Sequence, residues 1–188
     1  MTVFVQETAH PRRKQRRWLA WCGALVLTTF AAIAATGIHG FRVNFTPSEP
    51  IGLWRILPLD RPVRNGDLVF ICPPITEAMR EARARGYLRY GLCTGGVAPM
   101  IKTVAATSGQ IVDIHHDVRI DGNQLAHSQP MAKDARGRQM VPYRGGVVPS
   151  GTLYLHSDFP GSFVSRYFGP LPLENVLGMA REVWTYDP

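Results

Sequence analysis

The chain has 188 residues, a length that suits one domain with at most a short appendage. Apolar residues make up 45% of it, which is enough for a packed core. Charged residues make up only 19%, which is below average. The 15 prolines and 18 glycines indicate many turns, so a β-rich globule is favoured over a helical bundle. The sequence contains no low-complexity segment and no repeat of solenoid or propeller period, which excludes those architectures.

The net charge of +7 is unevenly placed. Residues 12–17, RRKQRR, hold five of the 21 basic residues, and no ionised side chain occurs in the 21 residues of 18–38. A helix of that length spans about 30 Å, the thickness of a bilayer core, and flanking Lys and Arg stay cytoplasmic. The sequence therefore predicts a cytoplasmic basic tail (1–17), a transmembrane anchor (18–39) and a domain on the far side of the membrane (40–188).

Three other interpretations of this N-terminal region remain open. The small residues Ala34 and Ala35 are compatible with a cleaved signal peptide, although the apolar run is longer than the usual h-region of about 7–15 residues. Arg16 and Arg17 resemble a weak twin-arginine signal. The basic cluster would also suit nucleic acid, but its position against an apolar span favours a role in topology, so no nucleic-acid partner is expected.

Beyond the span, the chain is expected to be mainly β. Prolines and a glycine exclude a regular helix from residues 44–54. One short soluble helix is predicted at 75–86, ITEAMREARARG, because Glu and Arg pair at helical spacing and Gly86 suits a C-cap.

The remaining elements are expected to be short strands joined by polar loops. Loops are predicted at residues 90–99, which are rich in glycine, and at 127–150 and 158–170. Strands are predicted within 64–72, 100–106, 118–126 (a hairpin around Asp121-Gly122), 151–157 and 175–184, the last also compatible with a helix. This pattern predicts a β-rich domain.

The three cysteines and the histidines suggest no metal site. Cys22 lies in the apolar span, and Cys72 and Cys93 lie in the outer domain, where an oxidising compartment would allow a disulfide. Sequence alone does not decide whether that pair is bonded or simply buried. His115 and His116, in a segment read as an exposed strand, lack further ligands at a suitable spacing, so no metal and no organic cofactor is expected.

Ser48, in the segment NFTPSEPIGLW, is a candidate nucleophile that needs a neighbouring base. His127 and His156 are weak candidates for that base. Lys102, in PMIKTVAA, has apolar neighbours on both sides, and burial would lower its pKa and let it act as a general base. The alternative is an ordinary lysine that points from a strand edge into solvent.

Four segments resemble one known family. NFTPSEPIGLW, MIKTVAATSGQIV and SFVSRYFGP occur in the order found in membrane-bound signal peptidases, and RGYLRYGLCTGGVAPMIK (85–102) is similar to one branch of them. That branch is the TraF-type conjugative transfer peptidases, within the serine–lysine signal peptidase family. The resemblance extends from the apolar span to Met179.

The resemblance implies a signal-peptidase-like β-rich catalytic domain and a role for each matching residue. Ser48 matches the nucleophile and Lys102 the general base. Thr46 matches a hydroxyl that helps form the oxyanion hole, with the backbone N–H of Ser48 as the other donor. Ser162 matches a serine that orients the lysine amine, and Arg166 falls in a Ser-Arg segment that supports the site. Alternatively, Thr46 and Ser162 could simply form turns, and Arg166 could form a surface ion pair.

The sequence also departs from the family pattern. Signal peptidases commonly carry Asp two residues before the matching arginine, and Val164 stands there. Asp158 is a candidate substitute that does not align with that position. The glycine–aspartate after the lysine strand is Gly109-Gln110 here, and the Ser-x-Pro spacing fits the conjugative branch better than the housekeeping one.

These resemblances imply a single-pass inner-membrane serine endopeptidase that processes a conjugative pilin precursor, with a membrane-embedded protein substrate and the lipid bilayer as its partners. Two alternatives remain: a general type I signal peptidase for secretory precursors, and a non-catalytic membrane-anchored subunit of a transfer apparatus. Hydrolysis and acyl transfer to an amine, which would cyclise the pilin, are not distinguished.

Overall fold

The computed structural model describes residues 11–187 and divides the chain into two units, one ending at Phe41 and one beginning at Arg42. The first ten residues of the expected basic tail lie outside the described part. From residue 11 on, the first unit holds the helix α1 (Pro11–Ile38), with Pro11 at its start, where a missing N–H costs nothing. The helix is continuous through most of the basic run, so the expected tail and anchor share one element.

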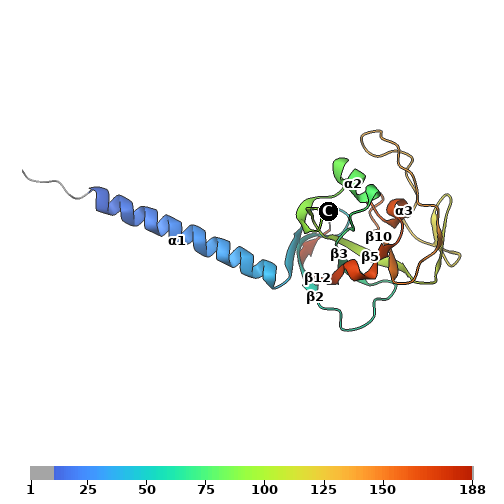
Figure 1. Cartoon of the computed structure of the whole chain (residues 1–188), viewed down its shortest axis with the longest axis horizontal. Helices are drawn as coiled ribbons and strands as arrows, with labels where there is room; N and C mark the ends of the chain where they lie inside the picture. The colour runs from blue at the N-terminus through green and yellow to red at the C-terminus, as the bar shows by residue number, and fades with distance from the viewer. Residues whose placement is uncertain (1–10, 188) are drawn as a thin grey trace, which may run out of the picture. The chain divides into compact units, whose positions relative to one another are not determined.

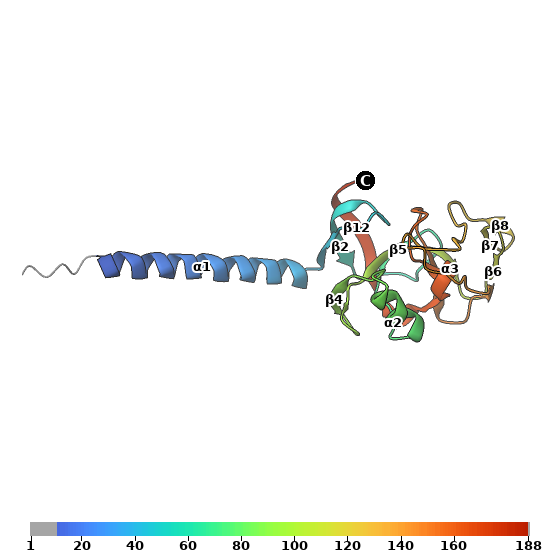
Figure 2. The same ribbon diagram turned by 90° about the horizontal axis from the view of Figure 1, so that it is seen from above.

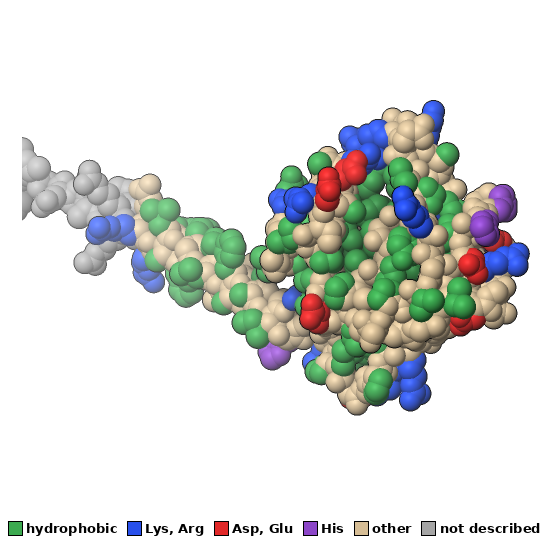
Figure 3. All heavy atoms as spheres, turned by 45° about the vertical axis from the view of Figure 1, so that its right-hand side comes forward, with side chains coloured by type: hydrophobic (Ala, Val, Ile, Leu, Met, Phe, Trp, Pro, Cys, Tyr) green, Lys and Arg blue, Asp and Glu red, His purple; other side chains and the backbone are tan. Residues whose placement is uncertain are grey.

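Residues Lys14–Ile38 of α1 are long and apolar enough to cross a membrane. Figure 3 shows apolar side chains along the exposed surface of this helix. The hydroxyls of Thr28, Thr29 and Thr36 donate to helix carbonyls three or four residues earlier, so these polar groups are satisfied inside the helix. Length and composition thus suit either a membrane anchor or a signal sequence.

The second unit is built on two antiparallel sheets, which confirms the β-rich fold expected from the sequence (Figure 1). The seven-stranded sheet has the order β1 (Phe41–Asn44), β2 (Ile51–Leu57), β12 (Val176–Tyr186), β3 (Leu68–Ile71), β5 (Met100–Thr107), β10 (Thr152–His156) and β11 (Leu171–Pro172). The four-stranded sheet has the order β8 (Asn123–Gln124), β7 (Val118–Ile120), β6 (Ile111–Ile114) and β9 (Gly146–Val147). Both views place β6 and β7 at the opposite end of the domain from β2 and β12 (Figure 2).

The predicted soluble helix is present as α2 (Glu77–Ala84). Its N-cap is Thr76, whose hydroxyl accepts a hydrogen bond from the Met79 amide at 3.2 Å, and Glu77 lies in the first turn, where a negative charge is favourable. Gly86 follows the last turn with a φ of +83°, as its C-cap prediction requires. Met79 is buried, so the helix packs on the sheet by its apolar face.

Three apolar clusters fill the domain. One contains Val69, Val104 and Leu155 from adjacent strands of the large sheet, together with Met79 of α2. A smaller cluster is built on Trp54, and a third, around Val112, lies under the small sheet. The strands that carry the candidate site residues are therefore held by cores on both sides.

The segment before β5 forms a hairpin containing β4 (Tyr90–Cys93), where the sequence predicted only a glycine-rich loop. Gly91 is required here because a Cβ atom would lie 2.4 Å from the Ala98 Cα. A disulfide joins Cys93 to Cys72, at the end of β3, with their Cα atoms 5.6 Å apart. The question that the sequence left open is thus answered in favour of a disulfide.

The structure differs from the sequence-based predictions in two segments and decides between two alternatives in a third. The region 158–170 contains a short helix, α3 (Ser165–Phe168), followed by a 3-10 turn, η1 (Leu173–Asn175). His115 and His116 lie in a bend after β6 rather than in a strand. The ambiguous final segment is a strand, β12, because it pairs with both β2 and β3.

Candidate active site

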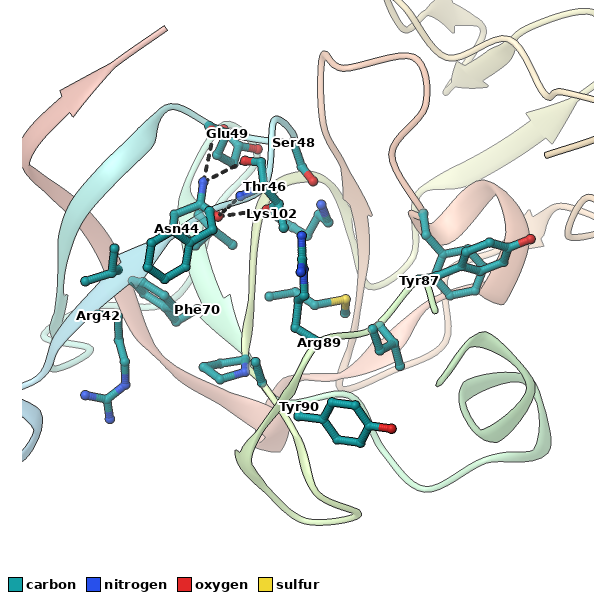
Figure 4. A pocket seen from close by; sticks show the side chains of 18 residues that line it. Arg42, Asn44, Thr46, Ser48, Glu49, Phe70, Tyr87, Arg89, Tyr90 and Lys102 are labelled. Carbon is teal, nitrogen blue, oxygen red and sulfur yellow. Dashed lines mark hydrogen bonds between the residues drawn. The ribbon is translucent and has the colours of Figure 1, made fainter. Parts of the chain in front are cut away.

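A cavity of about 520 Å³ lies between the loop after β1, strand β5 and the β4 hairpin. Figure 4 shows side chains from these three segments directed into it. Ser48, Thr46 and Lys102, all predicted from the sequence, line this one cavity. The other side chains used below that line it are Asn44, Phe45, Glu49, Phe70, Arg89, Met100 and Ile101.

The loop that carries Ser48 is organised by Asn44, the last residue of β1. Its side-chain amide donates to the carbonyl oxygens of Thr46 (2.9 Å), Glu49 (2.8 Å) and Pro50 (3.1 Å). Its oxygen accepts from the Thr46 amide at 3.0 Å, an Asx-type turn. The indole of buried Trp54 donates to Pro50 at 2.9 Å, so the loop is fixed at both ends.

Ser48 is half-buried and its hydroxyl points toward the same end of the cavity as the Lys102 amine (Figure 4). Its carbonyl oxygen accepts a hydrogen bond from the hydroxyl of Ser157, which is fully buried and lies just after β10. Within residues 11–187 the Ser48 amide donates to no acceptor. The backbone is thus anchored through its carbonyl while its N–H faces no protein partner.

Lys102 lies on β5 opposite Val69 of β3 and is only 4% exposed. Its Nζ donates to the Ser162 hydroxyl at 2.8 Å. Burial lowers the pKa of Lys102 to about 8, the Glu49 carboxylate partly opposes this, and the Arg166 cation adds to it. A substantial fraction of the amine is therefore neutral near pH 8, in contrast to a solvent-exposed lysine. The interpretation of Lys102 as a solvent-exposed residue at a strand edge is wrong.

Glu49 is a residue of this cavity that the sequence analysis did not single out. Burial raises the pKa of its carboxyl group to about 7, against the attraction of Lys102, and the carboxylates of Asp158 and Glu182 raise it further. The buried Oε1 atom accepts no hydrogen bond from the described residues. The electrostatic environment of Lys102 therefore includes a carboxyl group that changes charge near neutral pH.

Ser162 and Arg166 are both buried and do not line the cavity. Arg166 is 1% exposed, and its guanidinium donates to the carbonyl oxygens of Pro160, Ser162 (3.2 Å) and His127 (3.4 Å). Its side chain also stacks on the Tyr167 ring, 5.0 Å from the centroid. These contacts hold the segment that presents the Ser162 hydroxyl to Lys102.

Asp158 is not in contact with that arrangement. Its side chain is 85% exposed, with Oδ1 3.6 Å from His156 Nε2 and 3.9 Å from His127 Nδ1. Burial lowers the pKa of His156 to about 4, and the Asp158 charge opposes this. At the position where signal peptidases carry Asp, Val164 is buried in the protein core.

Thr46 differs from its expected role in one detail. Its hydroxyl donates to the Asn44 oxygen at 2.7 Å, so its single proton is engaged inside the loop. Donation to a substrate oxyanion requires this hydroxyl to rotate away from Asn44. The Ser48 N–H needs no such change.

The sequence analysis did not single out three side chains of this candidate site: Asn44, Glu49 and Ser157. Asn44 had a readable signal, because Asn two residues before a Thr in a proline-rich segment is typical of an Asx turn. Ser157 had none, since its partner lies 109 residues away in the sequence. Within residues 11–187, no cluster of three or more His, Cys, Asp or Glu side chains is arranged to hold a metal ion.

Comparison with known proteins places the chain in a family. Residues 15–185 match the family model for signal peptidase, peptidase S26. The chain therefore belongs to the S26 signal peptidase family, as a TraF-type member.

Its relatives point to the same branch. It is 49% identical over 188 residues, all of both chains, to a probable conjugal transfer protein TraF of Sinorhizobium fredii (strain NBRC 101917 / NGR234). It is 53% identical over 177 residues, 94% of this chain and 99% of the relative, to a conjugal transfer protein TraF of Agrobacterium tumefaciens (strain 15955). A thylakoidal processing peptidase 1 of Arabidopsis thaliana is 28% identical over 129 residues, 68% of this chain and 33% of the plant protein. These similarities support a peptidase function in conjugation that acts on a protein substrate.

Proposed function

We propose that this protein is a membrane-anchored serine endopeptidase in which Ser48 and Lys102 form the catalytic dyad, and that it processes a conjugative pilin precursor. One observation carries the proposal. The Lys102 amine is buried, has a lowered pKa, and is hydrogen-bonded to Ser162 beside a cavity that Ser48 also lines. That environment suits a base rather than a structural cation.

The reaction begins when Ser48 Oγ attacks the carbonyl carbon of the scissile bond and its proton passes to the neutral Lys102 Nζ. The Ser48 N–H and, after rotation, the Thr46 hydroxyl donate to the oxyanion that forms. When the C–N bond breaks, the Lys102 ammonium returns its proton to the departing amine and an acyl-enzyme remains.

The acyl-enzyme is released by a second nucleophile that Lys102 deprotonates. Water gives hydrolysis, and an amine of the substrate gives a new peptide bond and a cyclic product. Ser162 keeps the Lys102 amine oriented through both stages, and Arg166 positions Ser162 by holding its carbonyl oxygen. Asp158, exposed and next to His156, has at most an indirect electrostatic effect on this chemistry.

We place α1 in the inner membrane, with its basic start in the cytoplasm and the domain from Arg42 on in the periplasm. The run of Lys and Arg before the apolar residues supports this orientation. The Cys72–Cys93 disulfide is compatible with it, because the periplasm is oxidising. A substrate with its own apolar segment would share that membrane.

The test is processing of a pilin precursor by the full-length protein in a membrane preparation. Ser48→Ala and Lys102→Met are each expected to abolish processing, and mass spectrometry of the product distinguishes a linear from a cyclic chain. Ser150→Ala and Lys133→Ala change the same residue types at exposed positions and are the matched controls.

Two outcomes would contradict the proposal. If both dyad variants still process the precursor, the residues are wrongly assigned and a non-catalytic, accessory role becomes the better explanation. If the wild-type protein cuts ordinary secretory precursors as readily as pilin, it is a general signal peptidase.

A further inference from the structure

Arg89 is a charged residue of the cavity that the proposed mechanism does not use. It directly precedes β4, its side chain is exposed, and it lines the same cavity as Ser48 and Lys102. Figure 4 shows the side chain rising into the cavity, toward the end that holds these two residues. A substrate peptide bound for cleavage at Ser48 would therefore pass within its reach.

The guanidinium of Arg89 has no partner among residues 11–187: no hydrogen bond, ion pair or aromatic ring contact satisfies it. Nearby arginines differ. Arg83 donates to the Gly95 carbonyl and lies over the Tyr90 ring, Arg85 pairs with Glu81, and Arg138 pairs with Asp134 at 2.6 Å. Arg89, which Figure 4 shows directed into the cavity, thus has no anionic partner among the described residues.

The backbone that carries Arg89 is held in place. Its carbonyl oxygen accepts from the Ala98 amide at 2.7 Å, across the β4 hairpin, and the Gly91 amide donates to Gly96 at 3.2 Å. The Cys72–Cys93 disulfide ties the same hairpin to β3. A backbone held in place in this way lowers the entropy cost of positioning a long side chain for a ligand.

The surroundings of Arg89 favour an anion. Much of the cavity wall is apolar, with contributions from Phe45, Phe70 and Met100. A weakly hydrated guanidinium beside such surfaces forms strong paired hydrogen bonds with a carboxylate. Glu49, the one acidic residue lining the cavity, forms no ion pair with Arg89 and lies on the Ser48 side.

We propose that Arg89 binds a carboxylate of the substrate peptide near the scissile bond and so selects acidic substrates. The carboxylate belongs either to an Asp or Glu side chain or to the C-terminus of a peptide that ends close to the cleavage point. The inference rests on the proposed function, because it assumes that the cavity receives a peptide.

Peptide binding to the full-length protein in detergent tests this inference without requiring catalysis. The probes are fluorescent octapeptides of alanine and valine with one Glu at each position in turn. Each is matched by a Gln peptide and made both as a free acid and as a C-terminal amide. Binding is measured by anisotropy on Ser48→Ala protein, alone and combined with Arg89→Gln, Arg89→Glu or Arg80→Gln. Arg80, an exposed arginine on α2 outside the cavity, is the matched control.

We expect about tenfold tighter binding of the Glu peptide than of its Gln partner at one position, or of the free acid over the amide, which tells the two carboxylate sources apart. Arg89→Gln should reduce that preference to within twofold, Arg89→Glu should reverse it in favour of the uncharged partner peptide, and Arg80→Gln should leave it unchanged.

Equal binding of acidic and neutral peptides, no measurable binding of any acidic peptide, or a preference that survives Arg89→Gln overturns the inference. Acid-selective binding that depends on Arg89, together with failure of the wild-type protein to cleave any peptide or precursor, would instead overturn the proposed catalytic function alone.

Discussion

Lys102 and His156 lie on the neighbouring strands β5 and β10, and each is 4% exposed. Burial lowers the pKa of both, to about 8 for Lys102 and about 4 for His156. The same physical effect has opposite chemical results. It moves an amine toward the working pH, where its neutral form can accept a proton, and it moves an imidazole away from that range.

The two residues differ also in their contacts. The Lys102 amine is held by the Ser162 hydroxyl and lines the cavity, whereas His156 Nε2 has no hydrogen-bond partner among the described residues and does not line it. A histidine beside an aspartate resembles a familiar catalytic pair, but here it lacks both basicity and access. Lysine is the better base because burial brings its pKa close to the working pH, whereas the same effect takes the pKa of His156 well below it.

The largest expected effect tests this comparison directly. Lys102→Met should reduce kcat/KM for precursor cleavage by at least about a thousandfold, because the activated nucleophile loses its base. His156→Gln should stay within about threefold of the wild type, since its imidazole is a weak and inaccessible base. A loss of more than a hundredfold in the histidine variant, with a native circular dichroism spectrum, would reverse the assignment.

The second effect concerns the partner of the amine. Ser162→Ala removes the hydroxyl 2.8 Å from Lys102 Nζ and should lower kcat by about 10- to 100-fold with little change in KM, because the amine loses its orientation. Ser162→Thr, which retains a hydroxyl, should recover part of the loss. Equal losses in both variants would point to packing rather than to the hydrogen bond.

Burial of Lys102 should also reduce stability. The unfolded chain keeps the ordinary pKa near 10.5 and the folded protein has a pKa of about 8, so the bound proton opposes folding below about pH 8. This penalty fades as the pH rises toward 10.5. Lys102→Met should therefore raise the free energy of unfolding at pH 7 by roughly 2–3 kcal/mol, measured by denaturant titration. Lys133→Met is the exposed control, and equal effects of the two substitutions would contradict the prediction.

A smaller effect is expected at Glu49. Its carboxylate raises the pKa of Lys102, so Glu49→Gln should lower that pKa and shift the acidic limb of the kcat/KM profile to lower pH. At pH 7 the activity should rise by about two- to fivefold. Glu77→Gln, on α2, should leave the limb unchanged. A shift of the limb to higher pH would show that Glu49 acts in some other way.

The smallest effect is expected at Asp158. Its charge raises the pKa of His156, so Asp158→Asn should lower the His156 pKa further, as followed by NMR titration of the ring. Activity should stay within about twofold, because Asp158 contacts neither Lys102 nor Ser162. A loss of tenfold or more would restore Asp158 as the acidic member of the site.

Much of the fold was readable because local signals agreed with the tertiary structure. The Glu–Arg spacing and Gly86 identified α2, and the alternation of polar and apolar residues in MIKTVAA identified β5. The short helix α3 was missed because four residues carry too little periodicity to be distinguished from a loop. The β4 hairpin, which a disulfide joins to β3, was missed because its glycine-rich residues have the composition of a loop.

The candidate site also contains residues that the sequence predicted and residues that it could not predict. Ser48, Lys102 and Ser162 were selected by a resemblance of ordered segments, and the structure brings them to one region of the domain. Glu49 could not be ranked from sequence, because its raised pKa depends on burial created by residues far along the chain. Arg89 was likewise indistinguishable from the other arginines until their partners were known.

The side-chain amide of Asn44 holds the loop that carries Ser48 through three hydrogen bonds. Aspartate has nearly the same shape as asparagine but no side-chain N–H. Replacing Asn44 with aspartate would therefore turn three attractive contacts with carbonyl oxygens into repulsive ones. Spontaneous deamidation at this position would make that replacement in the finished protein. Loss of competence in an ageing sample would then be expected to accompany a mass increase of about one dalton, without unfolding of either sheet.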